Sequence, residues 1–136
     1  MKLSIYNIIL LILLICSTFV YPQNFNNEQN YSHLQGLQFI GKGNINEAIK
    51  YFKLSADSFS YSDSYHQLAI IYCDKNTVES RVLARKYIQK AIWSDSKNIE
   101  YRLLKAKLME KFSRKMAYDV YQEILNIDAT CTEALF

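Results

Sequence analysis

A small residue recurs along this chain at a spacing that restricts the fold to repeated pairs of helices. Ala48, Ala84 and Ala117 are separated by 36 and then 33 positions. Each alanine is followed four positions later by a large apolar residue, and three positions further by a smaller one. These residues are Phe52, Ile88 and Tyr121, and then Ser55, Ala91 and Ile124. A period of 33–36 residues with small and bulky positions in fixed order is typical of stacked two-helix units.

The helix that precedes each alanine carries a similar pattern. Gly36, Ala69 and Lys105 each stand three positions before a bulky residue, namely Phe39, Tyr72 and Leu108. We therefore expect an all-α fold of three antiparallel helical hairpins. The first helix is predicted at about 28–40, and the next four begin near residues 44, 60, 76 and 98. The sixth contains Met116, Ala117, Val120, Tyr121 and Ile124. The middle hairpin has three extra residues between Ala69 and Ala84, which should lengthen either its turn or the fourth helix.

Capping patterns mark several of these helix boundaries. The glycines at Gly41 and Gly43 are suited to a left-handed helix end. A capping residue followed three positions later by Glu predicts a capping box. Three such pairs are Asn44 with Glu47, Asn76 with Glu79, and Thr130 with Glu133. The last pair predicts the start of a seventh helix near the end of the sequence.

The first twenty residues differ from the rest of the chain. Lys2 precedes the unbroken apolar run Ile8–Ile15, as expected for a secretory signal peptide cleaved after Thr18. The alternatives are an uncleaved membrane anchor at 1–20, or a lipid attached at Cys16. Residues 21–28 read as a polar linker and 29–136 as the folded domain. Each alternative places the domain outside the cytoplasm, in the periplasm, in the cell envelope or as a secreted protein.

Three stretches of the domain resemble the tetratricopeptide repeat family. They are GLQFIGKGNINEAIKYF at Gly36–Phe52, YHQLAIIY at Tyr65–Tyr72 and AYDVYQEILNID at Ala117–Asp128. The resemblance implies three repeats, at about 29–60, 61–97 and 98–131, wound into a right-handed superhelix (an α-solenoid) with a concave groove. The chain departs from the family where Ser60, Ser96 and Ala129 replace the usual helix-ending proline. Lys105 also replaces a small residue, so we expect looser packing of the fifth and sixth helices. A related helical-hairpin repeat with longer loops is the alternative fold.

The resemblance also implies which residues line the groove. The positions that match are His33, Leu37, His66, Gln67, Ile70, Arg102 and Met109. His33, His66 and Arg102 would be equivalent positions on one wall, either as a polar ladder that grips a partner or as solvated side chains. The family's clamp for C-terminal carboxylates is not expected, because Gln67 and Ala106 do not supply its Lys and Asn.

Composition and motifs argue against several other functions. The formal net charge of +3 is too small to indicate nucleic-acid binding. Two histidines are too few for a structural metal site, and no catalytic or phosphate-binding spacing is present, so no cofactor or metal is expected. A disulfide between Cys73 and Cys131 is conceivable in an oxidising compartment, but these positions are expected to lie too far apart.

Charge is unevenly distributed in the second half of the sequence. Eleven Lys or Arg residues lie between Arg81 and Lys115, against three acidic residues, whereas four acids and no base follow from Asp119. This distribution indicates either an ordinary solvated surface or a basic face on the fourth and fifth helices. Such a face would meet an acidic protein or an anionic membrane.

The sequence as a whole predicts a non-catalytic scaffold that binds a protein or peptide in its groove. Its partners do not include nucleic acid, and residues 1–20 offer membrane association. The alternative is that the repeats form the N-terminal part of a larger exported enzyme, such as a peptidase, truncated at Phe136.

Overall fold

The fold is all-α, as predicted. The computed structural model describes residues 31–135, and no strand occurs within that range. Residues 31–41 are helical and precede α2 (Ile45–Phe59), α3 (Ser62–Lys75), α4 (Val78–Ser94), α5 (Ile99–Glu110) and α6 (Arg114–Ile127). A short 3-10 helix, η1, follows at Thr132–Ala134.

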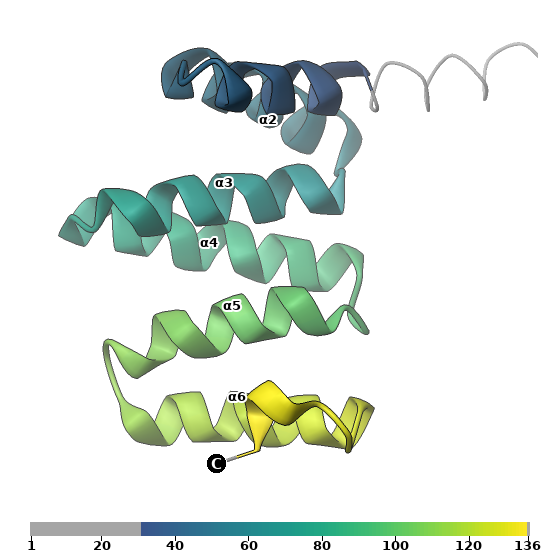
Figure 1. Ribbon diagram of the computed structural model, residues 1–136, viewed down its shortest axis with the longest axis vertical. Helices are drawn as coiled ribbons and strands as arrows, with labels where there is room; N and C mark the ends of the chain where they lie inside the picture. Colours follow the sequence, from purple (N-terminus) through teal and green to yellow (C-terminus); the bar gives the residue numbers. More distant parts are fainter. Residues whose placement is uncertain (1–30, 136) are drawn as a thin grey trace, which may run out of the picture.

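The helices are arranged in the order of the sequence along the long axis of the molecule (Figure 1). Each helix from α3 to α6 runs antiparallel to the one before it and packs against it. The pairs α3–α4 and α5–α6 share the most extensive contacts, so these helices form hairpins. Contacts between α2 and α3, and between α4 and α5, join each hairpin to the next.

The repeated small residues lie at the centre of this packing. Ala48 and Ala84 are completely buried and Ala117 is 3% exposed. The first hairpin shows why a small residue is needed: a Cβ atom on Gly36 would lie only 2.5 Å from the ring of Phe52. Because real Cβ contacts do not come this close, glycine permits the approach of the two helices.

The third hairpin differs at the corresponding position. Lys105 is half-buried, whereas the next residue, Ala106, is completely buried. The small side chain of α5 is therefore displaced by one position relative to the first two hairpins. The stem of Lys105 instead lines a hollow between α4, α5 and α6, which is described below.

The three extra residues of the middle hairpin lengthen its second helix. α4 begins at Val78, six positions before Ala84, whereas α2 and α6 each begin three positions before their buried alanine. The insertion therefore adds about one turn at the start of α4. Val78 lies on this added turn and is 65% exposed, and Val82, which follows the turn, is 60% exposed.

The predicted capping box of α4 is wrong by one position. Thr77 is the N-cap, and its side chain and that of Ser80 form the reciprocal bonds of a capping box. Asn76 instead ends α3 in the left-handed conformation, with φ of 51°. A residue in that conformation cannot also adopt the extended backbone of an N-cap, so Asn76 terminates one helix and Thr77 begins the next.

The other two capping patterns have different outcomes. Asn44 caps α2 by accepting a hydrogen bond from the Glu47 backbone N–H, and Gly43 has the expected left-handed φ of 71°. The Glu47 carboxylate, however, pairs with Lys50. The predicted seventh helix is only the single turn of η1.

The cap of that seventh helix is also wrong. Both the backbone N–H and the hydroxyl of Thr130 donate to the Asp128 carboxylate. Because the Thr130 hydroxyl bonds to Asp128 in this local turn, it does not cap a helix. Cys131 is instead the N-cap of η1.

The predicted leader at 1–20 and linker at 21–28 lie outside the described residues, as do the first positions of the helix predicted at 28–40. Across residues 31–135, no helix combines the length and the apolar character required to cross a membrane.

Candidate functional site

His33 does not line an open groove, because it packs between three helices. Its side chain is 9% exposed, and Nδ1 lies 2.8 Å from the hydroxyl of Ser64 on α3. The imidazole also contacts the rings of Phe52 and Tyr61, with centroids 5.5 and 5.0 Å away. His33 therefore joins the helix at 31–41 to α3.

His66 occupies the equivalent position one hairpin later. It is 6% exposed, and its ring centroid lies 4.8 Å from that of Tyr101 on α5. His66 therefore joins α3 to α5 in the way that His33 joins the first helix to α3. The prediction of two solvent-facing histidines is wrong in this respect: both side chains are used for packing between successive hairpins.

The remaining predicted groove residues fall into two groups. Arg102 donates to the Ser96 carbonyl and to Glu123 of α6, at 2.6 Å from the carboxylate, and Met109 is 5% exposed. Leu37, Gln67 and Ile70 retain accessible surface: Leu37 is 39% exposed and the other two are half-buried. These three are the members of the predicted set that remain available to a partner.

A polar cluster connects the buried histidines. Asp63, near the start of α3, accepts a hydrogen bond from the hydroxyl of Tyr101. Burial lowers the pKa of both His33 and His66. The negative charge of Asp63 partly opposes this effect at His33, and the charges of Glu100 and Asp63 partly oppose it at His66. Burial, together with the hydrogen bond to Asp63, raises the pKa of Tyr101. The histidines are therefore held neutral and the tyrosine protonated at neutral pH.

This cluster stabilises the packing of the helices. Its buried groups lie between helices, and none of them lines any of the surface hollows described below. In residues 31–135, no group of three or more His, Cys, Asp or Glu is placed to hold a metal ion. Cys73 and Cys131 both carry free thiols.

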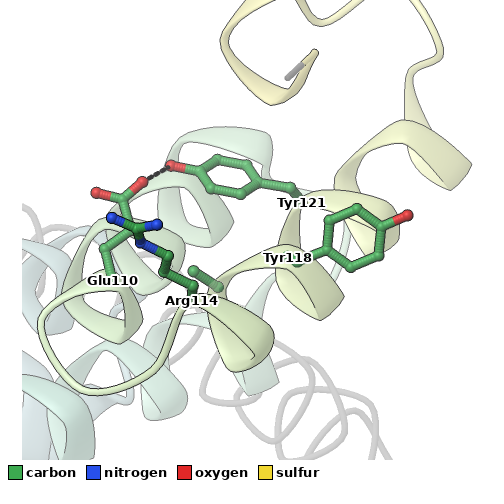
Figure 2. A pocket seen from close by; sticks show the side chains of 5 residues that line it. Glu110, Arg114, Tyr118 and Tyr121 are labelled. Carbon is green, nitrogen blue, oxygen red and sulfur yellow. Dashed lines mark hydrogen bonds between the residues drawn. The ribbon is translucent and has the colours of Figure 1, made fainter.

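One surface hollow lies on the last hairpin, where Glu110, Arg114, Ala117, Tyr118 and Tyr121 enclose about 460 Å³. The hydroxyl of Tyr121 donates to Glu110 at 2.7 Å, while Tyr118 is directed away from this pair (Figure 2). Burial and this hydrogen bond raise the pKa of Tyr121 to about 12, so its hydroxyl remains a donor at neutral pH.

A second hollow, of about 480 Å³, lies between the middle and the last hairpin, and we refer to it as the basic hollow. α4 contributes most of its walls, α5 adds two residues and α6 adds one. The lining residues are Val82, Arg85, Lys86, Ile88, Gln89, Lys105, Met109 and Met116. A third, smaller hollow of about 240 Å³ lies beside Trp93, which is 75% exposed.

No family model matches this chain. A search of curated proteins likewise finds no similar sequence. Its function is therefore inferred from the residues and their geometry.

The basic hollow was only partly predictable from the sequence. The excess of Lys and Arg between Arg81 and Lys115 indicated either an ordinary solvated surface or a basic face on the fourth and fifth helices. The apolar floor was not predicted, because Met109 of the fifth helix was assigned to the concave groove. The one clear signal was Lys105, which replaces a small residue where two helices would otherwise meet closely.

Proposed function

We propose that this protein is a non-catalytic scaffold that binds a protein or peptide partner through repeated helical hairpins. In this proposal the hairpins form a short right-handed solenoid similar to a tetratricopeptide repeat domain. The helix at 31–41, α3 and α5 line the concave side.

A contact repeated at the same register is the observation that carries this proposal. His33 bonds to Ser64 of the next hairpin, and His66, 33 positions later, packs on Tyr101 of the hairpin after that. The same position therefore forms the junction twice. Units joined through one repeated junction are related by one repeated rotation, which generates a superhelix.

The accessible residues of the inner face suggest what it binds. Leu37 and Ile70 supply apolar surface, and the amide of Gln67 can both donate to and accept from a peptide backbone. An extended segment with apolar side chains suits this combination, because its backbone can pair with the amide while its side chains cover the apolar residues.

Location outside the cytoplasm is part of the proposal and depends on residues 1–20. Mass spectrometry of the mature N-terminus tests it. A chain that begins at Phe19, or a lipid on Cys16, supports export, whereas an unmodified chain that begins at Met1 and is recovered from the cytoplasm contradicts it.

A displayed library of random peptides, selected on the purified whole chain, tests peptide binding by the inner face. We expect enriched sequences with apolar residues, and at least tenfold weaker binding of those peptides to Leu37→Asp. Val78→Asp is the matched control, because Val78 is also exposed but is the first residue of α4, a helix outside the proposed concave side. Failure to enrich any peptide, or equal binding to wild type and Leu37→Asp, would overturn the proposal.

A further inference from the structure

The basic hollow is lined by three cationic side chains. Arg85 and Lys86 are exposed on α4, and Lys105 faces them from α5. Within residues 31–135, no carboxylate forms an ion pair with any of these three side chains. None of the residues that line the hollow is acidic. Three like charges around one concavity repel each other, so an anionic ligand that enters would relieve this repulsion.

The floor and rim of the same hollow are apolar. Ile88 and Met109 are buried beneath it, whereas Val82 and Met116 are 60% and 45% exposed at its edge. Methionine side chains are flexible and adapt to ligands of different shape. A small inorganic anion would leave this apolar surface uncovered, so the hollow suits a ligand with both charged and apolar groups.

The position of Lys105 explains why the hollow occurs at this junction. The corresponding residue is Gly36 in the first hairpin and Ala69, which is completely buried, in the second. A lysine at this position keeps its charged end toward solvent and cannot be enclosed as alanine is. Val82, two positions before Ala84 on α4, adds apolar surface at the rim of the same hollow.

We propose that the basic hollow is a second docking site, for an acidic amphipathic segment of a partner protein. Carboxylates of the segment pair with Arg85, Lys86 and Lys105, and an apolar side chain between them enters the space above Met109 and Met116. A protein segment fits better than a membrane, because a concavity of about 480 Å³ accepts a protruding side chain, whereas a bilayer surface is flat.

The proposal predicts a specific dependence on charge and on salt. The probe is a fluorescein-labelled synthetic peptide in which pairs of Glu flank Leu and Phe, titrated with the whole chain and followed by fluorescence anisotropy. Because the screening length shortens from about 10 Å at 0.1 M salt to about 3 Å at 1 M, a change from 50 to 500 mM should weaken binding at least tenfold. A peptide of Glu alone, which lacks the apolar anchor, should bind at least tenfold more weakly than the probe.

Charge-reversal variants locate the site. We expect Arg85→Glu and Lys105→Glu to weaken binding at least tenfold, and Lys105→Arg to retain it. Lys107→Glu is the matched control, because Lys107 is exposed on α5 but does not line the hollow. It should change the affinity less than twofold. Circular dichroism verifies that each variant is folded.

Several results would overturn the proposal. One is absence of binding, and another is equal weakening by Lys105→Glu and Lys107→Glu, which would indicate diffuse attraction to net charge. A third is binding to phosphatidylserine vesicles without binding to the peptide. Leu37→Asp should not affect the probe, so this site and the inner face can fail independently.

Discussion

Replacing Gly36 with alanine tests the close approach between the helix at 31–41 and α2. The new Cβ would lie 2.5 and 2.6 Å from two ring carbons of Phe52, whereas ordinary contacts begin at 3.4 Å. The ring or the helix must therefore move by about 1 Å, judged from the 2.5 and 3.4 Å distances. Phe52 is completely buried, so its ring cannot move into solvent.

The expected magnitude is the difference between two effects. Overpacking of this kind costs about 1–3 kcal/mol. Alanine in place of glycine inside a helix gains about 1 kcal/mol. We therefore expect a net destabilisation of about 1 kcal/mol, and up to about 2. For a domain of this size each kcal/mol lowers Tm by about 4–8 °C.

Urea unfolding followed by circular dichroism at 222 nm measures this change. Gly41→Ala is the matched control, because a Cβ at that position meets nothing within 4 Å. It should leave stability unchanged or raise it. In a double-mutant cycle, Phe52→Leu should reduce the effect of Gly36→Ala, because it removes the ring that the new Cβ would contact. The reasoning is refuted if Gly36→Ala is as stable as Gly41→Ala.

Two other perturbations have defined outcomes. The pKa values of His33 and His66 are lower in the folded state than in the unfolded chain. As pH falls, the unfolded chain therefore binds protons before the folded protein does. The stability contributed by the neutral histidines should be complete above about pH 6.5 and decrease as pH drops below it. Thermal melts from pH 7.5 to 5 should show this fall, and His33→Gln should make it smaller; an unchanged pH dependence in that variant would contradict the assignment. Thr77→Ala should cost about 1 kcal/mol by removing the cap of α4, as measured by urea unfolding. Asn76→Gly should cost nothing, because glycine accepts the left-handed backbone, and a larger loss at Asn76 than at Thr77 would show that the cap is misassigned.

The repeat of small residues predicted the all-α fold correctly, because it reflects a requirement that acts locally. Two helices can approach closely only where a side chain is small. Ala48, Ala84 and Ala117 meet this requirement, and it can be read from the sequence without knowledge of the neighbouring residues. The three extra residues predicted either a longer turn or a longer fourth helix, and the structure has the longer helix.

The errors occurred where two local interactions compete for the same group. Asn76 could begin a helix or end one, and the left-handed conformation decides in favour of the end. The Thr130 hydroxyl could cap a helix or bond to the carboxylate of Asp128, and in the structure it bonds to Asp128. A spacing pattern contains both options and does not rank them.

The histidines illustrate a different limit of sequence reasoning. Their register was predicted, but their burial depends on side chains from the next hairpin, namely Ser64 for His33 and Tyr101 for His66. Those partners lie 31 and 35 positions away in the sequence. The residue pattern of a single helix does not show which of its side chains the next hairpin covers.

The most direct test of the account is a nuclear Overhauser measurement on the folded chain. The repeated junction between hairpins predicts cross-peaks between the ring protons of His66 and Tyr101, whose centroids lie 4.8 Å apart. It also predicts cross-peaks between His33 and Tyr61, at 5.0 Å. Observation of both sets would support one junction used twice. A folded protein in which either histidine ring instead faces solvent, without these cross-peaks, would contradict it.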